Sequence, residues 1–332
     1  MKVFITGANG YIGSSLCRYL LARGWEVHGL VRRTSDLHNL EGLTVRIHTG
    51  DLRDPASFKI PPGITHVIHS ASIVSDTAGD ATCRDNIYLL AVNLAAKLRT
   101  MPQPPQRLLY ISTALVLGYN GLDISEERPG ESAMFLAYTR YKVKTEEFFR
   151  QQWREQGIPL VILRPGDVYG PYDRVSCAQL LRGCERKLPL IVGPGNCRFG
   201  FCYIDNLCQA MLQALTRPGI EGRAYTVTNG ILPTWGEFFS GLQRRMHFRQ
   251  RLRVPAWGGY ALAGVLRGVQ FLFPHFVPEV NYYRIRRITT ETTYDISRTI
   301  ADLGYQPDDQ IERQIDEIVA WYLREKKNGY FT

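Results

Sequence analysis

Three side chains near the middle of the sequence, Thr113, Tyr138 and Lys142, are of the types needed for acid–base chemistry on a carbonyl group. Tyr138 and Lys142 lie four positions apart in YTRYKVKTEE, a spacing that places both on one face of a helix. A free tyrosine titrates near pH ~10, so an ammonium group beside it is needed to favour the phenolate. A threonine hydroxyl next to the phenol would hold the substrate oxygen. The set predicts proton transfer to a carbonyl oxygen or from an alcohol.

The Tyr-x-x-x-Lys spacing has low specificity alone, because the sequence contains it twice. LLYISTALVLG (108–118) reads as a strand that delivers Ser112 and Thr113 to the edge of a sheet ahead of the first copy. The second copy, Tyr322 and Lys326, lies in an amphipathic segment with no such strand before it. We therefore expect this second copy to lie on the surface, without a catalytic role.

A glycine-rich loop opens the chain in MKVFITGANGYIGSSLCRYL, between an apolar strand and a helical pattern. One glycine makes the tight turn, one lets the backbone approach a pyrophosphate, and one lets the helix pack on the strand. The helix N-terminus then offers unpaired N–H groups and a partial positive charge to the anion. We predict a dinucleotide-binding loop formed by Gly7, Gly10, Tyr11, Ile12 and Gly13. With a nicotinamide dinucleotide bound, the Thr–Tyr–Lys set indicates hydride transfer.

The end of the second apolar run, EVHGLVRR, indicates which dinucleotide binds. Enzymes that use NAD usually place an acidic residue here for the ribose 2′-hydroxyl, whereas this chain has Val31, Arg32 and Arg33. A guanidinium can hold a 2′-phosphate with two hydrogen bonds, so NADP is favoured and NAD stays open. The alternative is that the arginines are a solvated surface pair. Asp51 in GDLRD could accept a hydrogen bond from the adenine amino group, or be an aspartate in a turn.

The elements that must position these residues alternate along the first half of the chain. Apolar, β-branched runs occupy Val3–Thr6, Val27–Val31, Val45–His48, His66–His69, Leu108–Ser112 and Pro159–Arg164. Helical patterns occupy Gly13–Arg23, a segment ending near Arg99, and Tyr138–Gln156. This alternation predicts an α/β fold, a Rossmann-type doubly wound parallel sheet with a smaller C-terminal substrate-binding lobe. We assign 1–165 and 196–222 to the nucleotide-binding domain, and 166–195 and 223–332 to the lobe.

One apolar stretch in the lobe, WGGYALAGVLRGVQFLF (257–273), is short for a membrane span, which needs ~20 apolar residues. It can be a helix over the substrate pocket. Alternatively it is an interfacial helix on an anionic membrane, helped by Arg284, Arg286 and Arg287. Peripheral membrane contact through 257–287 is therefore a hypothesis.

Composition excludes several classes of protein. The 332 residues are 45% hydrophobic and 21% charged, as in ordinary globular proteins. The net charge of +9 comes without a nucleic-acid-binding motif, so we expect no nucleic-acid partner. Seven cysteines without a CxxC pair suggest neither a disulfide framework nor a metal site, which favours a reducing cytoplasm. Met1 leads directly into an apolar strand, so we expect no secretory signal.

Several motifs occur in the order and approximate spacing of a known family: TGANGYIG, GDLRD, HSAS (69–72), STALVLG, YTRYK, LRPGDVYGP (163–171) and FCYIDNL (201–207). On these the chain resembles the extended short-chain dehydrogenase/reductase family over nearly its whole length. The resemblance implies that Thr113, Tyr138 and Lys142 are catalytic and that members are often dimers through two helices of the nucleotide domain. It also implies cofactor contacts at the glycine loop, on the adenine at Asp51 and Leu52, and on the nicotinamide side near Ala71, Pro165 and Val168.

Two branches of this family compete. Nucleotide-sugar epimerases and dehydratases hold NAD tightly and usually carry an asparagine at the position of Asp167, whose carboxylate would repel a diphosphate. By contrast, LVRRTSDLHNLEGL, GDLRDPASF, PLIVGPGNCRFGFCYIDNL and YDISRTIADLGYQP resemble the dihydroflavonol reductase and 3β-hydroxysteroid dehydrogenase-like branch. That branch is favoured, and it implies an apolar ketone, alcohol or lipid-like substrate. Leu117 in place of tyrosine and HSAS in place of HxAA depart from the usual pattern. A third hypothesis, a redox-sensing binding protein without catalysis, is disfavoured by the intact Thr113, Tyr138 and Lys142.

Overall fold

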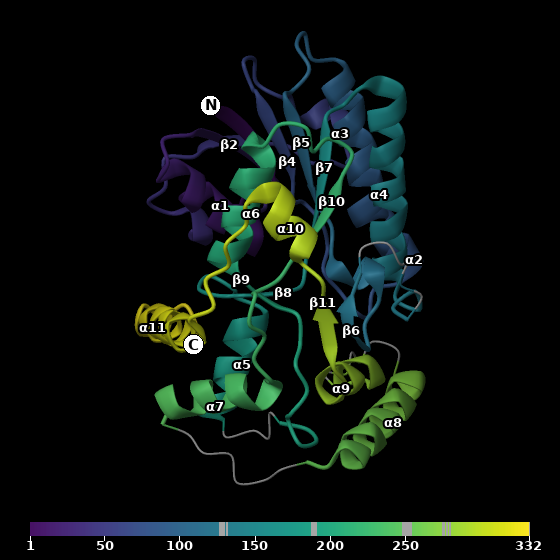
Figure 1. Cartoon of the computed structure of the whole chain (residues 1–332), viewed down its shortest axis with the longest axis vertical. Coiled ribbons are helices and arrows are strands. Elements are labelled where there is room, and N and C mark those ends of the chain that lie inside the picture. Colours follow the sequence, from purple (N-terminus) through teal and green to yellow (C-terminus); the bar gives the residue numbers. More distant parts are fainter. Residues whose placement is uncertain are drawn as a thin grey trace.

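A seven-stranded parallel sheet forms the centre of the computed structural model, which describes residues 1–125, 130, 132–186, 191–247, 254–273, 276, 278 and 280–331. The strand order is β10-β7-β5-β4-β1-β2-β3 (Figure 1). The strands are β1 (Lys2–Thr6), β2 (Glu26–Val31), β3 (Arg46–Thr49), β4 (His66–His69), β5 (Arg107–Ile111), β7 (Leu160–Pro165) and β10 (Ala224–Val227). The order reverses beside β1, which confirms the doubly wound sheet predicted from the sequence.

Side chains of the central strands alternate between two cores, as a pleated strand requires. Val3 and Ile5 face one core, and Phe4 faces the other. Helices α1 (Tyr11–Leu21) and α6 (Ile204–Thr216) cover the first face, while α3 (Leu89–Arg99) and α4 (Ala137–Gln156) cover the second. Because both faces are covered, the strands can be apolar along their whole length.

Shorter elements complete the part of the chain that holds the sheet and build a second body at the carboxyl ends of the strands (Figure 1). The first group is η1 (His38–Leu40), η2 (Pro55–Ser57), α2 (Asp80–Cys83), η3 (Arg84–Tyr88) and η4 (Ala114–Leu117). The second contains two small parallel sheets, in which β8 (Asp167–Tyr169) pairs with β9 (Phe201–Tyr203), and β6 (Gly121–Ile124) with β11 (Thr292–Tyr294). Its helices are α5 (Ser176–Glu185), α7 (Trp235–Arg245), α8 (Ala256–Leu272) and α9 (Tyr282–Thr289); α10 (Ser297–Leu303) and α11 (Ile311–Lys327) follow.

The predicted elements agree with the observed ones to within about two residues at each end, which is the usual disagreement between methods. One strand extends the sheet beyond the range assigned to it. β10 pairs with β7 although residues from 223 onward were assigned to the lobe. Residues 187–190 of the other lobe segment lie outside the described residues.

The second Tyr-x-x-x-Lys copy is not on the surface as expected. Tyr322 is fully buried in α11, and its hydroxyl donates a hydrogen bond to Glu185 at 3.0 Å. Lys326 pairs with the same carboxylate at 2.7 Å. The apolar face of α11 packs on α5 and α7, so this copy holds the C-terminal helix in place.

Candidate active site

The loops that follow β1, β4, β5 and β7 meet at one edge of the sheet, where ligands bind in open α/β folds. These loops carry the predicted residues Gly7, Ala71, Thr113 and Val168. Pro165 is the last residue of β7, and half-buried Val168 lies in the short strand β8 just beyond it. The topology thus gathers residues that are far apart in the sequence at one edge.

The glycine loop is built so closely that side chains would not fit. Gly7 has a φ of +69°, and a Cβ there would lie 2.8 Å from the Cα of Ala71. At Gly13 a Cβ would lie 2.2 Å from the carbonyl oxygen of Gly7. The Gly10 N–H donates to that same oxygen at 3.0 Å and closes the turn. These contacts explain the glycine spacing, and they bring α1 against the end of β1.

The first turn of α1, which begins at Tyr11 and Ile12, fits the pyrophosphate of a dinucleotide. No side chain caps this turn, and it contains no acidic residue. Its N–H groups and the positive end of the helix dipole are therefore suited to an anion. The buried hydroxyls of Tyr11 and Ser112 have no hydrogen-bond partner within the described part of the chain. Buried polar groups are normally satisfied, so these two hydroxyls have hydrogen-bonding capacity that a polar ligand could use.

A threonine fixes the loop after β4 against the glycine loop. The hydroxyl of Thr6 lies 2.9 Å from Nδ1 of His69 and accepts a hydrogen bond from the Ala71 N–H at 3.3 Å. Burial lowers the pKa of His69 to about 3, and the nearby Lys142 acts in the same direction. His69 is therefore neutral, and it positions Ala71 as part of this network.

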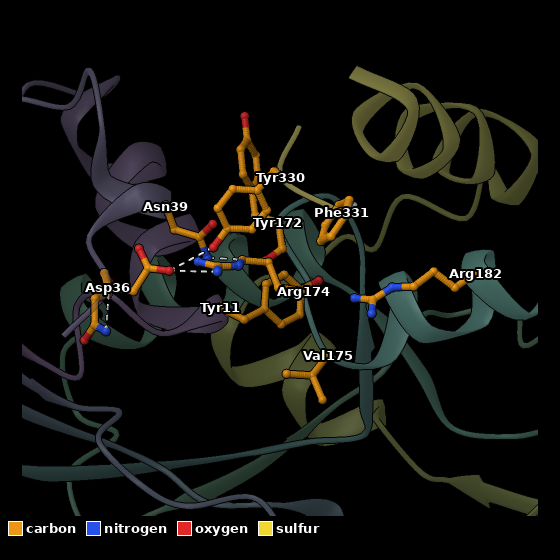
Figure 2. Close-up of a pocket in the computed structure, with 10 residues that line it drawn as sticks. Tyr11, Asp36, Asn39, Tyr172, Arg174, Val175, Arg182, Tyr330 and Phe331 are labelled. Atoms are coloured by element: carbon orange, nitrogen blue, oxygen red, sulfur yellow. Dashed lines mark hydrogen bonds and ion pairs between the residues drawn. The ribbon is translucent and has the colours of Figure 1, made fainter. Parts of the chain in front are cut away.

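A pocket of about 540 Å³ adjoins the glycine loop (Figure 2). Its walls come from the glycine loop, the segment after β2, the segment from β8 into α5, and the C-terminus. The lining residues are Asn9, Tyr11, Asp36, Asn39, Tyr172, Arg174, Val175, Arg182, Tyr330 and Phe331. Arg182 and the N-terminus of α1 favour a phosphate-bearing ligand in this pocket, while Arg174 is paired with a carboxylate.

Within this pocket, Asp36 ties three distant segments together, and sequence reasoning missed it. Its carboxylate pairs with Arg174 at 2.7 Å and accepts a hydrogen bond from the Tyr330 hydroxyl at 2.8 Å (Figure 2). The Arg174 guanidinium also lies 4.1 Å from the centre of the Tyr330 ring. Hydrogen bonding to the His38 N–H and the pairing with Arg174 lower the pKa of Asp36. A contact between residues almost 300 positions apart leaves no local signal.

The predicted adenosine contacts lie at the ends of β2 and β3. Arg32 and Arg33 are exposed, and neither forms an ion pair with a carboxylate of a described residue. The Asp51 carboxylate instead holds Arg53, at 2.6 Å, and this pairing lowers the pKa of Asp51 with help from the charge of Arg32. The carbonyl of Leu52 accepts a hydrogen bond from Asn93 at 2.7 Å, which fixes the backbone there.

The predicted catalytic side chains come together at the first turn of α4. Thr113 lies two residues after the end of β5. It caps η4, because its hydroxyl accepts a hydrogen bond from the Leu115 N–H at 3.3 Å. Burial raises the pKa of Tyr138 to about 12, and a hydrogen bond with the Thr113 side chain opposes that rise. At neutral pH the Tyr138 hydroxyl is therefore protonated and placed beside a second hydroxyl.

One turn further along α4, the buried Lys142 lies on the same face as Tyr138. Its ammonium nitrogen is 5.8 Å from the centre of the Tyr138 ring and donates to the Ile111 carbonyl at 2.9 Å. Burial lowers the pKa of Lys142 to about 7, while Glu146 opposes this change. Glu146 in turn forms a buried two-pronged pair with Arg164 of β7, at 3.0 and 2.6 Å.

The surroundings of Tyr138 are apolar. It is packed with Cys83, Ile87 and Ala137 in one small cluster, and Leu115 lies at the edge of that cluster. Tyr283 of α9 packs nearby against Tyr119 and Leu136. A carbonyl group that reaches Tyr138 is therefore expected to be carried on an apolar molecule.

Two of the three arginines of α9 are paired with carboxylates. Arg284 contacts Asp76 at 2.7 Å, and Arg287 forms an ion pair with Asp167. The charge of Asp167 is thus compensated, so Asp167 should repel a diphosphate less strongly than its sequence position suggested. The pairs engage the charges of Arg284 and Arg287, although the Arg284 side chain is still 43% exposed.

The comparisons with known proteins place this geometry in context. Residues 3–228 match the NAD dependent epimerase/dehydratase family. Over 97% of the chain it is 29% identical to 98% of sterol demethylase protein B from Methylococcus capsulatus. Over 69% of the chain it is 30% identical to 69% of the 4-hydroxy-2-methyl-3-oxo-4-farnesyl-3,4-dihydroquinoline-1-oxide ketoreductase of Stigmatella aurantiaca.

The fold is shared with a solved structure whose name refers to a nucleotide sugar, unlike the names of these two relatives. The UDP-glucuronic acid 4-epimerase from Bacillus cereus, in complex with NAD, superposes with a TM-score of 0.78. The superposition covers 99% of this chain and all of the other, at 21% identity. At this identity the likeness establishes the fold alone.

Proposed function

Because the chain belongs to the NAD dependent epimerase/dehydratase family, we propose that it is an NADP(H)-dependent oxidoreductase of an apolar, lipid-like molecule. The reaction interconverts a ketone and a secondary alcohol. The observation that carries the proposal is the position of Tyr138, buried among apolar side chains with Thr113 and Lys142 beside it. The names of the sterol and farnesyl relatives support the same substrate class.

In this mechanism the chain holds the substrate oxygen and moves one proton. Thr113 donates a hydrogen bond to the carbonyl oxygen, and the Tyr138 hydroxyl donates the proton that converts the developing alkoxide to an alcohol. In its charged form the Lys142 side chain, close to the Tyr138 ring, favours the phenolate that remains. When bound, the nicotinamide dinucleotide supplies the hydride in reduction or accepts it in oxidation. In the oxidative direction, the Tyr138 phenolate takes the proton from the alcohol.

The proposed cofactor contacts follow the edge of the sheet. Gly7, Gly10, Tyr11, Ile12 and Gly13 would hold the pyrophosphate, and the pocket in Figure 2 adjoins them. The remaining contacts are Asp51 and Leu52 on the adenine, Arg32 on the 2′-phosphate, and Ala71, Pro165 and Val168 on the nicotinamide side. We further propose that the protein is a cytoplasmic homodimer. The chain divides into the nucleotide-binding domain and the substrate-binding lobe assigned above, except that β10 belongs to the sheet of the nucleotide-binding domain.

The cofactor proposal predicts a change of preference in one variant. Arg32→Asp is expected to lower kcat/KM for NADPH by roughly 10- to 100-fold, because a charge-assisted hydrogen bond contributes ~1.5–3 kcal/mol. The constants for NADH should stay within about threefold. Arg46→Ala is the matched control, since Arg46 lies at the opposite end of β3 and pairs with Glu26 at 2.8 Å. An unchanged NADPH to NADH ratio in Arg32→Asp would remove the 2′-phosphate assignment.

The function itself is tested by a substrate panel. Purified enzyme is supplied with NADPH and either a 3-ketosteroid, a farnesyl-bearing ketone, or UDP-glucose, and the loss of NADPH absorbance is followed. We expect steady oxidation with one or more of the apolar ketones and none with the sugar nucleotide. Mass analysis of nucleotide released from denatured protein provides the second readout.

A nucleotide-sugar epimerase or dehydratase is the alternative, and the Asp167–Arg287 ion pair is the observation that keeps it open. With the Asp167 carboxylate compensated, a diphosphate is no longer strongly repelled. This enzyme would release stoichiometric NAD on denaturation and convert a UDP-sugar with no net change in external NADPH. Either result would replace the proposal above.

A further inference from the structure

Helix α8 is packed in the reverse of the usual manner. A surface helix of a globular protein turns its large apolar residues inward. In α8 only Gly259 and Ala263 are buried, and they lie one turn apart on the side that meets Ile285 of α9. A Cβ at Gly259 would come within 2.8 Å of Val192, so this close contact depends on small residues.

The opposite face of α8 is apolar and open to solvent. Trp257, Ala261, Val265, Gly268 and Leu272 recur every three or four positions, which places them on one face. Trp257 is 75% exposed, Val265 65% and Leu272 71%.

Further large apolar residues extend this surface. Leu262 and Phe271 border the exposed face, and Phe273 continues it past the end of the helix. Phe271 is 86% exposed. Patches of this kind on soluble proteins mark a surface that another molecule covers.

The charged residues within α8 and α9 are of one sign. The pair of helices α8 and α9 contains four arginines and no acidic residue: Arg267, Arg284, Arg286 and Arg287. Ion pairs engage Arg284 and Arg287, and the exposed Arg286 has its guanidinium 5.8 Å from the centre of the Tyr119 ring. Arg267 is exposed on α8 itself. Two copies of this face brought together would oppose arginines to arginines, whereas an anionic surface would be complementary.

We propose that the exposed face of α8, with Arg267 on the same helix and the arginines of the adjoining helix α9, docks on an anionic lipid membrane. The helix would lie in the plane of the interface, with Trp257 and the apolar residues inserted and the arginines at the headgroups. Among the described helices none is both long and apolar enough to cross a bilayer. α8 lies at the outer edge of the lobe, beyond α9 (Figure 1), so docking would leave the sheet and the glycine loop clear.

The test is flotation with vesicles of phosphatidylcholine containing phosphatidylglycerol, at low salt. The full-length wild type is expected to float. In Val265→Glu/Leu272→Glu the binding constant should fall by roughly tenfold or more, because two apolar side chains that would be buried in the interface are replaced by charged ones. Ile231→Glu is the matched control, since Ile231 is 72% exposed outside α8, and it should float like the wild type.

Tryptophan fluorescence gives a readout that does not depend on a charged variant. Brominated lipids should quench the wild type on vesicle binding, and Trp257→Phe should lose that quenching while still floating. Failure of the wild type to float, or equal flotation of Val265→Glu/Leu272→Glu, would overturn the proposal. Equal flotation on phosphatidylcholine alone would overturn the anionic assignment. A wild-type dimer that Val265→Glu/Leu272→Glu dissociates, without flotation, would assign the face to a second copy. None of these readouts uses turnover, so their failure leaves the oxidoreductase proposal unaffected.

Discussion

Phenylalanine in place of Tyr138 is expected to lower kcat for ketone reduction by about 10²- to 10⁴-fold, the usual contribution of general acid catalysis. The substitution removes only the hydroxyl, and the ring keeps its packing against Cys83 and Ile87. Because Tyr138 carries no proposed cofactor contact, the dissociation constant for NADPH should change by less than about threefold. Steady-state turnover and fluorescence titration with NADPH provide the two measurements.

Two other tyrosines serve as controls for this result. Tyr141 lies on the same helix and at the edge of the same cluster, so Tyr141→Phe should leave kcat within about twofold. Tyr322 belongs to the second Tyr-x-x-x-Lys copy, and Tyr322→Phe should change stability without a specific loss of turnover. If Tyr138→Phe retained more than about a tenth of wild-type activity, Tyr138 would not be the proton donor.

Glu146→Ala is expected to lower the free energy of unfolding by about 3–5 kcal/mol. Glu146 and Arg164 are both buried, so the substitution leaves the guanidinium in the interior without this carboxylate. The same change removes a negative charge that favours the ammonium form of Lys142, so the pKa of Lys142 should fall further. Urea denaturation followed by circular dichroism measures the change in stability.

Glu147→Ala provides the matched control, because Glu147 is the next residue on α4 and is exposed. Surface substitutions of this kind usually change stability by no more than ~0.5 kcal/mol. Equal stability of the Glu146 and Glu147 variants would show that the buried pair contributes little to the fold. The contrast therefore separates the ion pair from a general effect of charge on the helix.

The sheet and the catalytic turn could be predicted because their signals are local. β1, the glycine loop and α1 follow one another along the chain, and the contact that requires glycine at position 13 lies within this loop. Tyr138 and Lys142 share a helix face through their spacing alone. Thr113 is placed by the end of β5, whose apolar sequence marks it as a buried strand.

What could not be predicted depends on pairing between distant residues. Asp36 contacts Arg174 and Tyr330 because the C-terminal segment lies near the glycine loop in the folded chain. The sequence around Asp36 does not indicate these contacts. Arg287 and Asp167 are also far apart in the sequence, and their ion pair compensates the charge of Asp167. The sequence alone predicted that this charge would repel a diphosphate.

The two amphipathic segments of the C-terminal part show the same limit. Tyr322 was expected on the surface because its helix pattern did not reveal which side packs on α5 and α7. The apolar pattern of α8 could indicate either a buried or an interfacial helix. The structure shows that Gly259 and Ala263 are the buried residues of α8 and that its large apolar residues are exposed, which the pattern alone did not reveal.

The central claim is that a hydride passes between an NADP cofactor and an apolar ketone, and transfer of deuterium tests it most directly. NADPH carrying deuterium at the transferred position of C4 is incubated with the enzyme and the ketone that gives turnover in the substrate panel. The account predicts an alcohol with one deuterium on the carbinol carbon, formed in step with NADP. It would be contradicted if no apolar ketone were labelled while a UDP-sugar was epimerised by enzyme-held NAD without incorporating the label.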